Sequence, residues 1–125
     1  MLRAVTLQSS RTKKKKKIKM SKKRIYISLP ISGYDLDERK ETALAMEVKL
    51  RGRGYDVFNP LGDNFQPGLT TNEYMKLDLK ALLDCDAIMF MHNFNKSAGC
   101  HTELCVAMAC GMEIWFEDLQ SPQKI

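Results

Sequence analysis

The stretch AIMFMHNFNKSAGCHTELCVAMACGMEIWF, from Ala87 to Phe116, decides the fold class of this protein. It begins with AIMFM (87–91) and ends with EIWF (113–116), two short, mainly apolar runs that predict strands. A fully apolar run such as AIMFM is expected of a parallel strand that is covered on both faces. The segment from Leu104 to Gly111 predicts a short helix without a polar face, which we expect to be buried.

The rest of the chain repeats this alternation of strand and helix. Two further β-rich runs, RIYIS (24–28) and YDVFNP (55–60), stop at loops that contain Pro or Gly. The resulting order β-α-β-α-β-α-β predicts a three-layer α/β/α fold with a four-stranded parallel sheet, of the flavodoxin or Rossmann type. In such sheets, ligands bind beyond the carboxyl ends of the strands, near the switch in strand order.

The two other predicted helices have clear start signals. Asp35 is the expected N-cap of the first helix, and Gly52 or Gly54 is expected to end it. After a loop over residues 61–70, the second helix is predicted in TNEYMKLDLKALLDC, with Thr71 or Asn72 as its cap.

Charge divides the chain into parts that need separate interpretations. Residues 1–24 carry 11 of the 20 basic residues and no acidic residue, so the remainder of the chain is acidic. We expect a disordered basic tail at 1–23, a folded domain at 24–119 and a short C-terminal tail at 120–125. Nucleic-acid binding is expected only through the basic tail, and the alternative is that this tail has no part in the chemistry of the domain.

Composition also bears on location and metal binding. The sequence has no apolar run long enough to span a bilayer and no signal-peptide core, so we expect a cytoplasmic protein with no membrane partner and with reduced cysteines. Cys100, His101, Cys105 and Cys110 are conceivable metal ligands. Steps of five residues turn about 140° around a helix, so the three thiols do not share a face and we expect no metal.

Two carboxylates lie near the expected ligand crevice. Glu103 is expected in the first turn of the helix after the third strand, where unpaired amides and the helix dipole favour negative charge. Asp78 lies beside the apolar stripe of the preceding helix. Such a pair suits chemistry at an acetal-like carbon, where one carboxylate attacks or stabilises the anomeric carbon and the other handles a proton. The alternative is that Glu103 serves only to complement the helix dipole.

Four blocks of the chain resemble the nucleoside 2-deoxyribosyltransferase-like superfamily, and in particular a small bacterial and phage branch of unknown function. The blocks are IYISLPISG, GYDVFNP, YMKLDLKALLDCDAI and SAGCHTELCVAMACGMEI, and together they cover nearly all of residues 24–117. The resemblance implies a homo-oligomer that acts on or binds a small nucleoside or nucleotide without a cofactor.

The resemblance also implies roles for individual residues. Glu103 takes the position of the nucleophile, and Asp78 that of the group that handles a proton and recognises the base. Tyr26 takes the position of a tyrosine that holds the glutamate and the sugar. Ser97 takes the position of a 5′-phosphate contact, and it is equally a candidate helix N-cap. The predicted substrate-binding residues are Ser28, Pro30, Ile31, Ser32, Gly33, Asn59, Ser97 and Gly99.

Several alternatives stay open at this point. Leu29 stands where the superfamily usually has glycine, so the first loop is expected to approach its ligand less closely. Tyr26 belongs only to the core if its ring faces a helix and not the crevice. His101 either contacts a phosphate or acts on a proton, or it faces solvent or caps the helix. Two functions follow from these expectations. One is an enzyme that transfers or hydrolyses at the N-glycosidic bond, and the other is a nucleotide-binding module without turnover.

Overall fold

Helices and strands alternate along the chain as the sequence predicts. A computed structural model describes residues 22–117; apart from Lys22 and Lys23, the tails predicted at 1–23 and 120–125 lie outside the described residues. The observed elements are β1 (Arg24–Ser28), α1 (Leu36–Gly52), β2 (Asp56–Phe58), α2 (Thr71–Leu83), β3 (Ala87–Phe90), the short 3-10 helix η3 (Phe94–Lys96), α3 (Ala98–Ala109) and β4 (Glu113–Phe116). Within the described range, no helix has the length and apolar character needed to cross a membrane.

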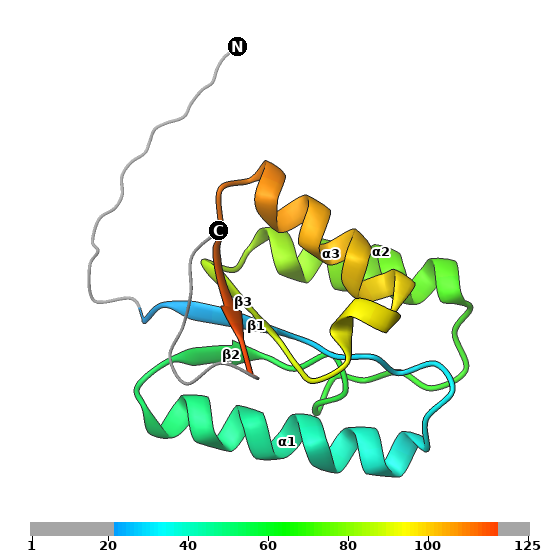
Figure 1. The fold of residues 1–125 in the computed structure, drawn as a ribbon. Helices are drawn as coiled ribbons and strands as arrows, with labels where there is room; N and C mark the ends of the chain where they lie inside the picture. The colour runs from blue at the N-terminus through cyan, green and yellow to red at the C-terminus, as the bar shows by residue number, and fades with distance from the viewer. Residues whose placement is uncertain (1–21, 118–125) are drawn as a thin grey trace.

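The four strands form one parallel sheet in the order β2-β1-β3-β4, which confirms the predicted fold class. β1 and β3 are central and pair directly, with Ser28 beside Phe90 at their carboxyl ends. The chain leaves β1 in one direction to form β2 and returns to form β3, so the switch in strand order lies between β1 and β3. Figure 1 shows α1 on one face of the sheet and α2 with α3 on the other, which makes three layers.

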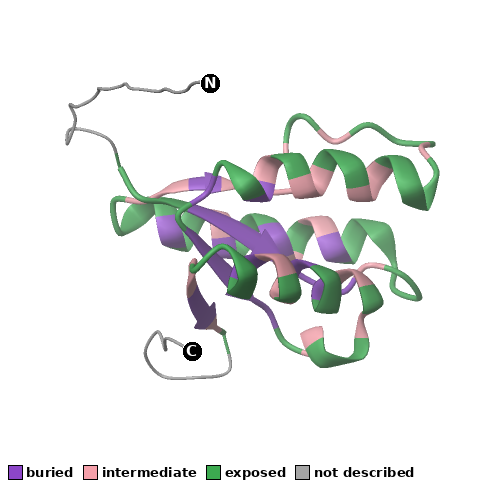
Figure 2. Cartoon of the chain, turned by 90° about the horizontal axis from the view of Figure 1, so that it is seen from above, coloured by how far each residue is buried: buried purple, intermediate pink, exposed green. Residues whose placement is uncertain are grey.

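Alternation along β1 divides its side chains between the two faces of the sheet. Ile25 and Ile27 pack in the cluster that contains Met46 of α1. Tyr26 packs in the opposite cluster with Leu82 of α2 and with residues of α3. β3 is buried along its whole length, as expected of a strand covered on both faces (Figure 2). Even-numbered residues of β1 therefore face the layer formed by α2 and α3.

The third helix differs from the prediction in both length and exposure. α3 begins at Ala98 and not near Leu104, because the Ser97 hydroxyl accepts a hydrogen bond from the Cys100 amide at 3.2 Å and caps the helix. Glu103 therefore lies six residues beyond the cap, and the prediction that it occupies the first turn is wrong. The helix is also not fully buried, since Met108 is 54% exposed on the side turned away from the sheet.

The boundaries of α1 and β2 are close to those predicted. The Asp35 carboxylate accepts a hydrogen bond from the Glu38 amide at 3.0 Å, which confirms Asp35 as the N-cap of α1. The helix ends at Gly52. β2 is shorter than the predicted strand over 55–60, because only residues 56–58 pair with β1.

The cap of α2 is Thr70, and the prediction of Thr71 or Asn72 is wrong. The Thr70 hydroxyl accepts a hydrogen bond from the Glu73 amide at 3.2 Å, and the Glu73 carboxylate accepts one from the Thr70 amide at 2.8 Å. These reciprocal bonds form a capping box, in which the acidic residue stands three positions after the cap. Glu73 therefore selects Thr70 among the neighbouring polar residues.

Replacing Thr70 with alanine should lower the free energy of unfolding by about 1 kcal/mol, because the Glu73 amide loses its acceptor. Urea unfolding followed by circular dichroism measures the change. Thr71→Ala is the matched control, since it makes the same chemical change one residue later without removing a cap. Equal losses in the two variants would contradict the assignment of Thr70.

Candidate active site

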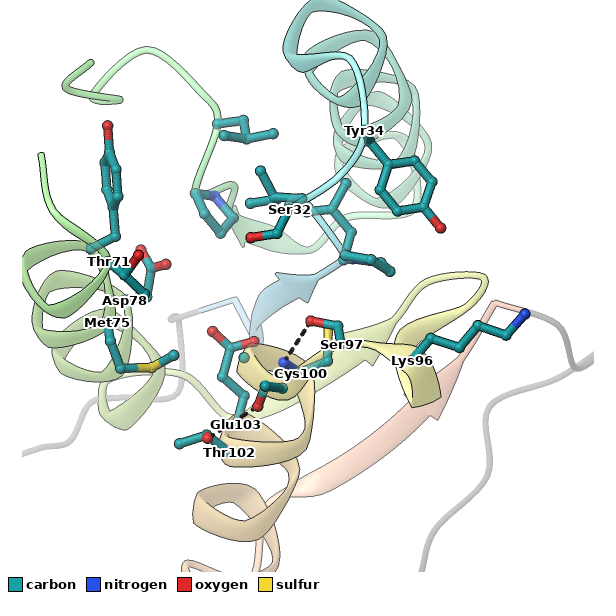
Figure 3. Close-up of a pocket in the computed structure, with 18 of the residues that line it drawn as sticks. Ser32, Tyr34, Thr71, Met75, Asp78, Lys96, Ser97, Cys100, Thr102 and Glu103 are labelled. Atoms are coloured by element: carbon teal, nitrogen blue, oxygen red, sulfur yellow. Dashed lines mark hydrogen bonds between the residues drawn. The ribbon is translucent and has the colours of Figure 1, made fainter. Parts of the chain in front are cut away.

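A cavity of about 540 Å³ lies at the carboxyl ends of β1, β2 and β3. This is the place where a parallel sheet binds its ligands, and the volume is that of a small-molecule site. The wall is formed by the loop after β1, the loop after β2, and the facing sides of α2 and α3 (Figure 3). Among the residues predicted for the site, those that line the cavity are Pro30, Ile31, Ser32, Asp78, Ser97, Gly99 and Glu103.

Two short hydrogen bonds join Glu103 on α3 to β1. The Tyr26 hydroxyl donates to Oε2 of Glu103 at 2.6 Å, and the Ser28 hydroxyl donates to Oε1 at 2.6 Å. All three side chains are buried, and Glu103 still reaches the wall of the cavity with 6% of its surface exposed. Tyr26 is at once part of the core, with its ring 5.4 Å from that of Phe58, and a partner of Glu103. Neither hydroxyl residue of β1 lines the cavity itself.

Burial raises the pKa of the Glu103 carboxyl to about 7, against the lowering effect of the hydrogen bonds from Ser28 and Tyr26. The negative charge of Asp78 adds to the rise. The expectation that the helix N-terminus keeps this carboxylate ionised is wrong, because the helix begins well before Glu103 and the two hydroxyls take that role. Glu103 therefore changes protonation state near neutral pH, as groups at active sites often do.

Asp78 approaches the same cavity from α2. Figure 3 shows its side chain and that of Glu103 at the same hollow, on two different helices. Asp78 is half-buried, and burial raises the pKa of its carboxyl to about 6. Within residues 22–117, no side chain forms a hydrogen bond or an ion pair with it. Its carboxyl is therefore available to a ligand.

The loop after β1 turns back on itself at the edge of the cavity. The Tyr34 amide donates to the Ile31 carbonyl at 3.1 Å, and Gly33 has φ +86°. A turn with positive φ at its third residue favours glycine there. Gly33 thus shapes the turn and does not line the cavity, whereas Ile31 and Ser32 do.

The side chain of Arg39 on α1 holds this loop in place. Its guanidinium is 4.4 Å from the Tyr34 ring, and Nη1 donates to the Pro30 carbonyl at 3.2 Å. Two further bonds, of 2.6 and 2.8 Å, join it to the Glu38 carboxylate. Arg39 is 9% exposed, and the planar fork of arginine allows one side chain to make all of these contacts. The position of the cavity wall at Pro30 therefore depends on α1.

The remaining predicted binding residues occupy different places. Ser97 lines the cavity and caps α3, so the two roles considered for it are compatible. Gly99 lines the cavity in the first turn of the same helix. Asn59 does not line the cavity: its amide donates to Glu47 at 3.0 Å, and its carbonyl oxygen accepts from the Leu61 amide at 2.9 Å. It therefore secures the start of the loop after β2.

Sequence reasoning missed several residues of the cavity. Phe65 belongs to a segment predicted only as a loop, and its ring stacks on that of Tyr74 with centroids 5.7 Å apart. Tyr74 and Met75 precede Asp78 on α2 by four and three residues, so both share with Asp78 the face that lines the cavity. Cys100 stands three residues before Glu103, so helical spacing alone could have predicted that it lines the cavity on the same face of α3.

The site can therefore perform acid–base and nucleophilic chemistry on a small polar molecule. Two carboxyls with raised pKa values face one hollow, and an ionised one can attack while a protonated one donates. His101 is exposed, and its Nε2 lies 2.7 Å from the Asn95 carbonyl oxygen. It is not among the residues of the cavity wall.

Fold and site together define a three-layer α/β protein with two carboxyls at a cavity beyond the strand ends. Comparison with known families matches residues 23–116 to a family described as a domain of unknown function, DUF4406, and the chain belongs to this family. Comparison with curated proteins gave no match.

A solved structure shares the fold. It is a CMP N-glycosidase, BcmB, of Clostridium botulinum, with a TM-score of 0.53 and 23% sequence identity. The similarity covers 75% of this chain and 67% of that chain. At this level of identity, the similarity supports the fold class and leaves the activity to the argument from the site.

The raised pKa of Glu103 predicts a pH dependence of stability. The unfolded carboxyl releases its proton near pH 4.5 and the folded one near pH 7, so the folded protein binds the proton more tightly and its stability falls as pH rises between these values. Glu103→Gln removes this titrating group. Between pH 5 and pH 8, the free energy of unfolding should therefore fall by about 2–3 kcal/mol less in Glu103→Gln than in the unchanged protein.

Urea unfolding at the two pH values measures the difference. Glu41→Gln, at an exposed position on α1, is the control and should behave like the unchanged protein. A Glu103→Gln variant with the same loss as the unchanged protein would contradict the assignment.

Proposed function

We propose that this protein cleaves the N-glycosidic bond of a nucleoside or a nucleoside 5′-monophosphate, by hydrolysis or by transfer of the sugar to another base. The observation that carries the proposal is the buried Glu103 carboxyl, held by two hydroxyls at the wall of the cavity opposite Asp78. The resemblance of four sequence blocks to the nucleoside 2-deoxyribosyltransferase-like superfamily supports the same reaction class. So does the fold shared with a CMP N-glycosidase.

In the first step, ionised Glu103 attacks C1′ of the sugar. The bond between C1′ and the base nitrogen breaks, its electron pair leaves with the base, and a glycosyl ester forms on Glu103. The Tyr26 and Ser28 hydroxyls hold the carboxyl in place during the attack. Glu103 is thus the nucleophile, and Tyr26 is a residue that positions it.

Asp78 handles the protons of both steps. In its protonated form it donates to the departing base, and it then takes a proton from the water or acceptor base that attacks C1′ and frees Glu103. With pKa values of about 6 and about 7, the two carboxyls share one proton across part of the neutral range. Glu103 has the higher pKa, so in the free protein this proton lies mainly on Glu103. Cleavage needs the proton on Asp78, and a hydrogen bond from Asp78 to the base of a bound substrate would favour that arrangement.

The cavity has suitable groups for the other parts of the substrate. Tyr74 and Met75 share the cavity face of α2 with Asp78, so we assign the base to this apolar side. Ser97, with the first amides of α3, is assigned to a 5′-phosphate, because a helix N-terminus favours an anion. Pro30, Ile31, Ser32 and Gly99 are assigned to the sugar between them.

One observation favours the second candidate function, a nucleotide-binding module without turnover. Leu29 lines the cavity in place of the glycine usual in the superfamily, and it is buried with 5% of its surface exposed. Its side chain packs in the cluster that contains Met46 of α1, so the backbone of the first loop is anchored at a position where glycine would leave it free. A ligand that stays too far from the carboxyl would bind without reacting.

Activity should depend on both carboxyls. We expect Glu103→Gln to lower the rate of base release at least about 10³-fold and Asp78→Asn about 10²-fold or more, with binding of the substrate largely kept. The assay follows free base by chromatography for a panel of nucleosides and 5′-monophosphates, with and without an acceptor base. Asp84→Asn is the control, since Asp84 follows the last turn of the same helix, near the amino ends of the strands and away from the cavity.

The outcomes of this assay separate the candidates. Base released without an acceptor indicates hydrolysis, and product formed only with an acceptor indicates transfer. If the unchanged protein binds a nucleotide by calorimetry but forms no product with or without an acceptor, the result would contradict the enzyme function and support the binding module. Activity that survives in Glu103→Gln would remove Glu103 as the nucleophile.

The phosphate assignment has a sharp test at Ser97. Aspartate keeps an oxygen acceptor for the Cys100 amide, so the cap of α3 persists, but its charge repels a phosphate. We expect Ser97→Asp to raise KM for nucleoside 5′-monophosphates about 10-fold or more and to leave KM for the matching nucleosides close to that of the unchanged protein. Equal rises for both substrate classes would contradict a phosphate contact at Ser97.

A further inference from the structure

We propose that Ser28 is a positioning residue of the site, whose hydroxyl holds one oxygen of Glu103 and keeps this carboxyl available in its ionised form. The sequence resemblance implies, in contrast, that Ser28 contacts the substrate. This arrangement exists before any substrate binds, and its importance for catalysis rests on the proposed function, in which Glu103 is the nucleophile.

The geometry of β1 makes Ser28 a partner of Glu103. Ser28 follows Tyr26 by two residues, so both side chains project from the same face of the strand toward α3. Ser28 is 1% exposed and does not line the cavity, so its hydroxyl cannot turn toward a ligand there. Burial of a hydroxyl costs free energy unless the hydroxyl is hydrogen-bonded. The Ser28 hydroxyl has one proton, and it donates this proton to Oε1 of Glu103 at 2.6 Å.

Each oxygen of the Glu103 carboxyl has its own donor. Tyr26 holds Oε2, and Ser28 holds Oε1. Among the described residues, the structure shows no other hydrogen bond from a side chain to this carboxyl. Loss of the Ser28 hydroxyl would therefore leave one buried oxygen without a donor, and the ionised form would be disfavoured.

The groups around Glu103 keep their donor character when it is ionised. Asp78, Tyr26 and Cys100 are the titratable groups that act on it from α2, β1 and α3. Burial raises the pKa of both the Tyr26 hydroxyl and the Cys100 thiol, so both stay neutral near pH 7. Ser28 does not titrate in this range, and its donation to Glu103 is therefore constant with pH.

The test is a direct titration of Glu103 in the full chain. Protein labelled with ¹³C at the glutamate carboxyls is titrated by NMR, and the Glu103 signal is identified by its loss in Glu103→Gln. We expect Ser28→Ala to raise the pKa of Glu103 by about one unit or more, as Tyr26→Phe should. Ser28→Thr keeps a hydroxyl and should stay close to the unchanged protein.

A folded Ser28→Ala protein in which Glu103 titrates as in the unchanged protein would overturn the proposal. If Ser28→Ala does not fold, Ser28→Cys carries the test, since its thiol is a weaker donor and should also raise the pKa of Glu103. The titration uses no substrate, so its result stands whether or not the protein cleaves nucleotides. If it does cleave them, Ser28→Ala should lower kcat several-fold with little change in KM.

Discussion

The site depends on one buried interaction, in which two hydroxyls of β1 hold the two oxygens of the Glu103 carboxyl. Removal of a carboxylate from water costs several kcal/mol unless hydrogen bonds replace the lost hydration. Here the replacement is incomplete, since burial still raises the pKa of Glu103 to about 7. A carboxylate that is under-solvated but firmly held is a better nucleophile than one exposed to water.

The parallel sheet explains why these groups meet. β1 is central, so its even-numbered side chains are covered by α2 and α3, and its carboxyl end opens at the switch in strand order. α3 starts soon after β3 and runs back along the sheet, so a residue near its second turn faces the end of β1. Tyr26 and Glu103 are 77 residues apart in sequence and are brought together by this topology alone.

The sequence predicted the alternation of elements and the fold class well, because fully apolar strands such as Ala87–Phe90 leave few other arrangements. It also indicated that Glu103 and Asp78 lie near one crevice. It offered Ser97 as a helix cap, which the structure confirms, but it did not extend the helix back to that cap. It failed at the start of α2, where Thr70 is preferred to its neighbours because of Glu73. The bond between Ser28 and Glu103 was beyond reach, since it requires the register of two distant elements.

Arg39 has a consequence for how this architecture can vary. A single guanidinium fastens the Pro30 carbonyl to the first turn of α1 and lies against the Tyr34 ring, which sets the span of chain between them. Inserted residues in this span would pull the carbonyl away from its donor and leave a mostly buried cation short of a partner. Exchange of side chains in this span would leave the anchor intact, whereas a change in its length would require a new anchor at position 39.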